Sequence, residues 1–495
     1  MTHRHEPPQA QRNTRVFCAL WLIMLTGAAA CHRSAAVIPP LNAAILRIGV
    51  GGLSQQANVA GLRQVVGNLS LEGLVNLTED GHPRPWLAER WQTAPDGLTL
   101  TLQLHRQIRF HDGTPITASI IVPMLQRLLP LAMGNAFEDV GEILALDDSR
   151  IQFRLRRPAP LVIESLEMPI QKSAKDTTGT GPYVPQNASE LKANAAYYLG
   201  KPTINRIQVT SFPSVRAAWA ELLRGSIDML YEVNADALDS LQSSSRVGVF
   251  SFVRHYQYTI MFGEHAPAFK SADIRRELNA VIDREAFVRE GLNGHGIPSS
   301  GPVPPRHWAL SPDAPKLRFD PQLAARLAAR HFRFTCIVPA DSVYERVALA
   351  LKRQLAAASV DMQVREVPQD EVVQATSKSD FEAVLVDTVS GPSLFRSYLR
   401  WHSGGPFTVK HIDSPLIDAA LDRIRHASSD DEYRAGVTAF QQAIVDDPPA
   451  IFLAWGERAR AVSRRFDVPV PENGRDVLAT LRLWQPAAEK RVAAN

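Results

Sequence analysis

The chain has 495 residues, which is enough for about two or three structural units. Hydrophobic residues make up 45% of the sequence and charged residues 21%, a composition that excludes disordered, collagen-like and coiled-coil proteins. Lys and Arg number 54 against 51 Asp and Glu, so the formal net charge is only +3, which argues against a general nucleic-acid-binding protein.

Residues 1–31 have the pattern of a signal peptide with a lipobox-like end. A polar, arginine-containing stretch precedes an apolar run at 16–25 that is too short to span a bilayer permanently, and small residues lead to Cys31. Two cleavage chemistries fit this point: a signal-peptidase site with small residues at Ala28 and Ala30, or lipidation of Cys31. We expect lipidation, although Ala28 stands where a lipobox usually has Leu. Either chemistry places the mature chain outside the cytoplasm.

Residues 32–43 predict a tether, and the rest of the chain predicts interleaved strands and helices. Strands are expected at 45–50, 99–104, 151–155, 206–211, 247–252, 256–262 and 383–392. Helices are expected at 117–129, 214–223, 272–290, 321–331, 343–358, 414–426 and 431–445. This order predicts a mixed α/β protein of several lobes. We expect no hydrophobic segment of membrane-spanning length after Cys31, and hence neither a channel nor a permease.

The sequence lacks the common motifs for catalysis and metal binding. It has no Gly-x-Ser-x-Gly, His-Glu-x-x-His, phosphate-loop or Cys-x-x-Cys pattern. The run Phe110-His111-Asp112-Gly113 predicts a turn, because adjacent side chains on a strand face opposite sides and cannot share a metal. His402 and His411 are candidate ligand contacts, with exposed loop residues as their simpler interpretation. We therefore expect no enzyme, no metal and no cofactor.

Short motifs in one order along the chain carry the positive signal. They are EGL (72–74), PWLAERW (85–91), PDGLT (95–99), FHDGTP (110–115), GTGPY (179–183), NAAYYLGKP (194–202), LRGSID (223–228), IRRELNAVIDR (274–284), GPVPP (301–305), Ile417-Asp418, the stretch 433–442 and Pro448-Pro449. Together they resemble the family 5 extracellular solute-binding proteins of bacterial ABC importers, the group of oligopeptide-, dipeptide- and nickel-binding proteins. The resemblance covers about residues 45 to 470.

The resemblance implies an α/β, two-lobed, periplasmic-binding-protein type II-like fold. Lobe I would comprise residues 44–262 with an accessory subdomain at about 76–175, lobe II residues 263–455, and residues 458–485 would return to lobe I. Such a receptor captures a peptide or other small polar solute between the lobes and delivers it to an ABC permease complex. We expect a monomer, periplasmic or on the cell surface, held to the membrane through lipid at Cys31. The alternative is a ligand-binding sensor or chaperone-like module without a transporter.

The candidate ligand-binding residues fall in three places along the chain. They are Gly52, Leu53 and Ser54 after the first strand, Asp387 and Thr388 on the strand at 383–392, and Arg396, Arg400 and Trp401 beyond it. Each arginine either pairs with a ligand carboxylate through a bidentate fork or lies on a helix surface. Trp401 either stacks on the ligand or fills the core.

The strand at 383–392 departs from the pattern of peptide-binding members. In those proteins an Asp four residues before the strand's Pro pairs with the α-ammonium group of the peptide. Here Thr388 occupies that position, and Asp387 lies one residue early. Because a shift of one residue turns a side chain to the other face of a strand, Asp387 serves an ammonium only if a β-bulge re-aims it.

Overall fold

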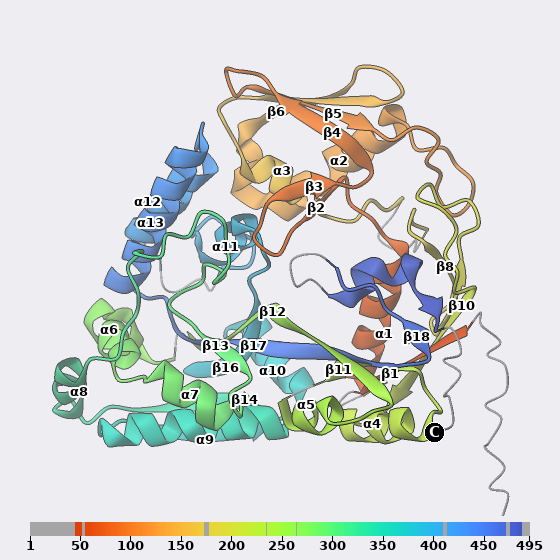
Figure 1. Cartoon of the computed structure of the whole chain (residues 1–495). Helices are drawn as coiled ribbons and strands as arrows, with labels where there is room; N and C mark the ends of the chain where they lie inside the picture. Colours follow the sequence, from red (N-terminus) through yellow and green to blue (C-terminus); the bar gives the residue numbers. More distant parts are fainter. Residues whose placement is uncertain are drawn as a thin grey trace, which may run out of the picture. The chain divides into compact units, whose positions relative to one another are not determined.

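The computed structural model describes residues 45–51, 55–172, 178–233, 235–263, 265–408, 413–471 and 476–487 (Figure 1). All of them belong to one compact unit of the chain, 42–495. The predicted signal peptide with Cys31 lies outside the described residues.

Eleven of the described strands form one mixed sheet, in the order β15-β14-β16-β12-β17-β11-β1-β10-β9-β8, with β13 paired to β17. Their bounds are β1 Ile45–Gly51, β8 Tyr183–Asn187, β9 Glu190–Ala193, β10 Arg206–Phe212, β11 Met229–Val233, β12 Val247–Phe262, β13 Gly296–Pro298, β14 Arg333–Pro339, β15 Asp361–Val367, β16 Ala383–Val389 and β17 Ala450–Ser463. β1 runs parallel to β10 and β11, and β14 runs parallel to β15 and β16.

Two long antiparallel strands, β12 and β17, connect the two lobes. Their pairing extends from Val247↔Ser463 to Met261↔Ala450, so one end of the pair lies beside β11 and the other end beside β16. The sequence predicted two strands at 247–252 and 256–262, and this is wrong: β12 is continuous. Its register against β17 shifts between Val253 and Gln257, which lets one strand serve both halves of the sheet.

Helices cover the sheet and build separate apolar cores on its two halves (Figure 1). Their bounds are α1 Gln55–Ser70, α4 Val215–Arg224, α5 Ala235–Gln242, η2 Pro267–Lys270, α6 Ala272–Ala280, α7 Arg284–Gly291, α8 Pro321–Ala328, α9 Ser342–Ala357, α10 Gln369–Lys378, α11 Leu394–Trp401, α12 Pro415–Arg425, α13 Asp430–Asp446 and η4 Val477–Leu483. The single helix predicted at 272–290 is two helices, because Asp283 accepts a hydrogen bond from the Ala286 amide at 2.9 Å and begins a new one.

A second, four-stranded sheet, β4-β5-β7-β6, lies within the range predicted for the accessory subdomain. Its elements are β4 Ala88–Thr93, β5 Thr99–Leu104, β6 Val140–Ala145 and β7 Arg150–Leu155, with α2 Ala118–Met133, η1 Gly134–Asp139 and α3 Leu161–Ser165. Two further pairs lie outside both sheets, β2 Val75–Leu77 with β3 Pro83–Pro85 and β18 Phe466–Asp467 with β19 Gln485–Pro486. The subdomain's apolar core is continuous with buried residues of α11, α12 and α13. The subdomain therefore packs against these three helices.

One segment of the described chain, 118–139, is long and apolar enough by length and composition to cross a membrane. The expectation that no such segment follows Cys31 is therefore wrong on length and composition. These two properties are weak support for a membrane span, however, because the helix α2 within the segment contains Pro123 and Pro130 and contributes Ile121, Leu125 and Leu129 to the subdomain core.

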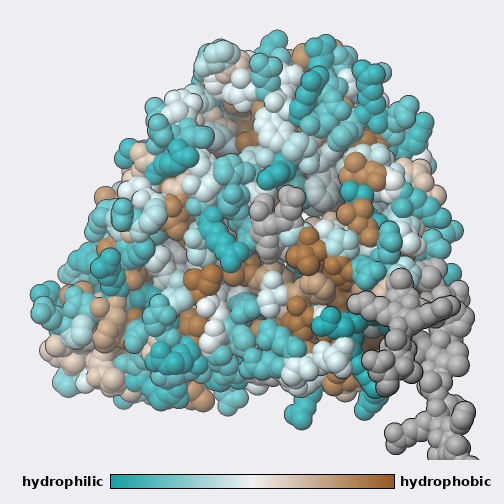
Figure 2. All heavy atoms as spheres, viewed as in Figure 1, coloured by the Kyte–Doolittle hydropathy of each residue, from teal (hydrophilic) through white to brown (hydrophobic). Residues whose placement is uncertain are grey.

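The surface in the view of Figure 2 is mostly hydrophilic, with hydrophobic residues in separate small patches. This distribution follows from the burial of the apolar side chains in the cores described above.

Candidate functional site

Asp387 and Thr388 lie near the end of β16, where neighbouring side chains face opposite sides of the sheet. β16 pairs with β12 in one register, from Phe262↔Ala383 to Tyr256↔Val389. The β-bulge that would turn Asp387 toward an ammonium group is thus not present in this described ladder.

The Asp387 carboxylate has partners within the protein. It lies opposite Tyr258, and the hydroxyl of Tyr344 on α9 hydrogen-bonds it. Burial raises the pKa of Tyr344 well above its ordinary value, and the charge of Asp387 raises it further. Burial alone would lower the pKa of Arg458, but Tyr258, Glu232 and Asp387 outweigh burial and raise it. Asp387 therefore already has a hydroxyl donor and a nearby cation.

Buried arginines continue this polar network along β17. Nε of Arg458 lies 3.1 Å from Oε1 of Glu232, and Nη2 of Arg460 lies 2.6 Å from Oδ2 of Asp476. Neither arginine was among the residues predicted from the sequence. The sequence does contain a pattern that points to them, because two arginines at alternate positions interrupt the otherwise largely apolar stretch 450–463. Buried charges of this kind require partners, so the pattern indicates a buried ion-pair network where the lobes are joined.

Thr388 belongs to a buried polar cluster on the other side of β16. Its Oγ1 lies 3.4 Å from both Oγ1 of Thr259 and the carbonyl oxygen of Gln257. Nε2 of Gln257 donates to the Gly301 carbonyl at 2.7 Å and to the Ser299 hydroxyl. Within the described part of the chain, Oε1 of Gln257 has no hydrogen-bond partner. The cluster offers neutral polar groups rather than charge at this position.

Helix α11 carries three predicted site residues in three different environments. Nη2 of Arg396 lies 3.2 Å from Oε2 of Glu167, just after α3. Arg400 is half-buried, burial lowers its pKa, and none of the described residues forms a hydrogen bond or ion pair with its guanidinium. Trp401 is 7% exposed and packs edge-to-face on Phe452, with ring centroids 5.2 Å apart. A contact between Trp401 and ligand stays a prediction.

Four of the remaining predicted site residues, three after the first strand and one histidine, lie outside the described residues. Gly52, Leu53, Ser54 and His411 are among the residues not described. Gly51, the last residue of β1, is described, and a Cβ there would lie 2.4 Å from the Val215 backbone at the start of α4. The glycine allows this close approach of strand and helix.

Asp139 at the end of η1 ties the subdomain to α12. Its carboxylate is fully buried, pairs with Arg425, and lies 2.9 Å from Nε of Arg157 and 3.3 Å from Nε2 of His426. Burial alone would raise the pKa of Asp139, but His426 and Arg425 outweigh burial and lower it.

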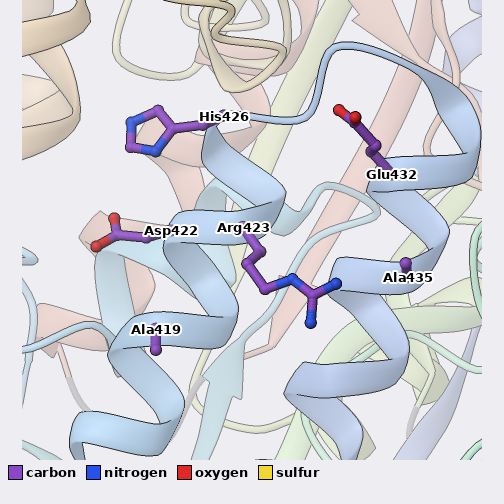
Figure 3. Close-up of a pocket in the computed structure, with 6 residues that line it drawn as sticks. All are labelled: Ala419, Asp422, Arg423, His426, Glu432 and Ala435. Carbon is purple, nitrogen blue, oxygen red and sulfur yellow. The ribbon is translucent and has the colours of Figure 1, made fainter.

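A groove of about 450 Å³ lies between α12 and α13, and Figure 3 shows its lining residues. They are Ala419, Asp422, Arg423, His426, Glu432 and Ala435. None of the predicted site residues lines it. Oδ1 of Asp422 lies 3.5 Å from Nε2 of His402, and neither atom forms a hydrogen bond within the described part of the chain. His402 is buried and stacks on Tyr398 at 4.4 Å, so its interpretation as an exposed loop residue is wrong.

The run Phe110-His111-Asp112-Gly113 forms the predicted turn. The Thr114 amide donates to Oδ1 of Asp112 at 2.9 Å, and Nε2 of His111 lies 3.0 Å from the Gly181 carbonyl oxygen. Over the described ranges, no three His, Cys, Asp or Glu side chains are grouped so that they could hold a metal ion.

The family model of bacterial extracellular solute-binding proteins, family 5 (middle region), matches residues 82–409. A probable D,D-dipeptide-binding periplasmic protein of Escherichia coli is 23% identical over 408 residues, 74% of this chain and 78% of that protein. Protein XP55 of Streptomyces lividans is 27% identical over 444 residues, 80% of each chain.

Solved structures share the fold. NikZ of Campylobacter jejuni in complex with Ni(L-His) has a TM-score of 0.75 at 21% identity, covering 89% of this chain and 99% of that one. The oligopeptide-binding protein AppA of Bacillus subtilis in complex with a nonapeptide has a TM-score of 0.73 at 19% identity, covering 90% and 99%. The two-lobed α/β prediction is confirmed.

Proposed function

Because the chain belongs to family 5 of the bacterial extracellular solute-binding proteins, we propose that it captures a peptide or other small polar solute and delivers it to an ABC import permease. The observation that carries this proposal is the family match over residues 82–409, together with two lobes connected by β12 and β17. Lobes joined by crossing strands can close over a solute. Relatives in sequence include proteins named for D,D-dipeptide and glutathione binding.

The proposed lobes keep the predicted bounds, 44–262 with 458–485 for lobe I and 263–455 for lobe II. The receptor acts as a monomer outside the cytoplasm, held to the membrane by lipid at Cys31. Its partners are the solute and the permease complex.

We place the ligand against residues 52–54, which follow β1 in the sequence, and the segment from the end of β16 to α11. The proposed contacts are Gly52, Leu53, Ser54, Thr388, Arg400 and Trp401. Arg396 is engaged by Glu167, and Asp387 by Tyr344, so we assign these two residues to contacts within the protein.

Native mass spectrometry of the exported chain tests the proposal. A bound solute should add a defined mass that is lost on unfolding, and refolded protein should recover it from a cell or medium extract. Small-angle scattering should then show a smaller radius of gyration at ligand saturation than without ligand. An unchanged radius at saturation would contradict closure. Failure to bind any solute from the extracts would contradict the receptor function.

A further inference from the structure

Arg400 is a cation for which the described residues supply no anion. It lies one helical turn beyond Arg396 on α11, and residues four apart share a helix face. Arg396 meets Glu167 at 3.2 Å, whereas no described residue pairs with the guanidinium of Arg400. Arginine cannot shed its proton in a protein, so the charge of Arg400 remains in a half-buried position.

Three buried arginines of this protein have carboxylate partners, whereas the buried Arg284 donates to the carbonyl oxygens of Phe452 and Asn279. Arg425 pairs with Asp139, Arg458 with Glu232, and Arg460 with Asp476. Burying a guanidinium without compensation costs free energy, and each of these pairs offsets that cost, whereas the half-buried guanidinium of Arg400 has no carboxylate partner among the described residues. A group that arrives from solution can supply that partner instead.

Near the end of β16, none of the described carboxylates is available to pair with an ammonium group of a ligand. The position at which a ligand ammonium would find a carboxylate holds Thr388, a neutral residue within a neutral polar cluster. The nearest carboxylate along the strand, Asp387, accepts a hydrogen bond from Tyr344 and lies near the charge of Arg458. The segment from 387 to 400 thus offers an uncompensated positive charge and no available negative charge.

Resting on the proposed function, we infer that Arg400 binds a carboxylate of the ligand, and that the solutes taken up are acids that need no free α-amino group. N-acylated or cyclised peptides and small organic acids are of this class. A guanidinium presents two parallel N–H donors that match the two oxygens of a carboxylate, which makes the recognition bidentate.

Matched peptide panels test the inference by thermal shift and calorimetry. The panels are dipeptides of the same side chains with a free amine and free acid, with an N-acetyl group and free acid, and with an N-acetyl group and C-terminal amide. We expect wild type to bind both acid forms and to bind the amides about 30-fold more weakly or worse. Arg400→Gln should abolish this preference for the acid, and Arg400→Lys should restore part of it.

Arg396→Gln is the matched control, because it neutralises an arginine on the same face that already has a partner. It should keep the ratio of acid to amide affinities, whatever it does to their absolute values. Far-UV circular dichroism establishes that each variant is folded.

The inference would be overturned if amides bound wild type as tightly as acids, or if Arg400→Gln left the ratio of acid to amide affinities unchanged. Either result would leave the receptor function standing. A requirement for the free amine would overturn it as well. If no peptide of the panels binds wild type, small dicarboxylic acids are the second panel, and failure of these also overturns the inference. The receptor function would fail only if solute from the extracts did not bind either.

Discussion

The Tyr433 hydroxyl on α13 donates a hydrogen bond of 2.6 Å to Oε1 of Glu164, a buried carboxyl on α3. Oε2 of the same side chain accepts the amide hydrogen of Phe395 in α11 at 3.0 Å. One carboxyl thus joins the accessory subdomain to two helices of the proposed second lobe. Burial raises the pKa of Glu164 although both hydrogen bonds act to lower it.

Glu164→Gln should reveal this raised pKa as a pH-dependent difference in stability. A carboxyl whose folded-state pKa exceeds its unfolded value contributes most below the unfolded pKa, about 4.3, and loses that contribution as pH rises through the folded value. Wild type should therefore lose unfolding free energy relative to the variant as pH rises above about 4.3, with a slope of up to about 1.4 kcal/mol for each pH unit until the folded-state pKa is passed. Urea denaturation at several pH values measures it. A difference that is constant, or that grows in favour of wild type, would contradict the assignment.

Asp139 should behave in the opposite sense. Its folded-state pKa is lowered, so its contribution is present above the unfolded value of about 3.9 and is lost as pH falls through the folded pKa. Asp139→Asn leaves Arg425 buried without its carboxylate and should cost about 3 to 5 kcal/mol at pH 7. Denaturation at pH 7 and near pH 3 should show this cost shrinking in acid. Arg157→Gln is the control, because Arg157 is half-exposed and should cost less than about 1 kcal/mol. Equal costs in both variants would refute the buried-pair account.

These contacts show where sequence reasoning reaches its limit. The short motifs identified the family resemblance and the α/β class, because turn residues and hydrophobic alternation are local signals. The partners of Asp387 are not local: Tyr344 and Arg458 lie far from it in sequence, on α9 and β17. Glu164 and Tyr433 are 269 positions apart. The sequence therefore shows that the carboxylate at 387 is displaced by one position. It does not show that a residue far away in the chain, Tyr344, donates a hydrogen bond to this carboxylate.

The N-terminal prediction can be tested in cells. We expect the mature protein to begin at Cys31 and to carry lipid, so a fatty-acid probe should label wild type and leave Cys31→Ala unlabelled. Cys336, which is buried in β14, serves as an internal control because its replacement should not change labelling. Equal labelling of wild type and Cys31→Ala would favour cleavage by signal peptidase without lipid.

The last prediction concerns whether Asp387 binds the amino group of the ligand. If this carboxylate paired with a ligand ammonium, Asp387→Asn would weaken free-amine peptides by about 30-fold or more, since an unpaired ammonium in a closed cleft costs about 2 to 5 kcal/mol. The continuous register of β16, the hydrogen bond from Tyr344 and the nearby charge of Arg458 lead us to expect otherwise.

Asp387→Asn should lower the unfolding free energy by about 1 to 3 kcal/mol, because the hydrogen bond to Tyr344 changes and Arg458 loses a nearby charge. The relative affinities for free and N-acetylated peptides should stay as in wild type.

Thr388→Asp is the complementary variant. It puts a carboxylate at the position that peptide-binding members use, and it should shift the binding preference toward free-amine peptides. Calorimetry with paired free and acetylated peptides measures both effects. A large loss confined to free-amine peptides in Asp387→Asn would show that Asp387 holds the ligand and that the carboxylate reaches the cleft despite its partners.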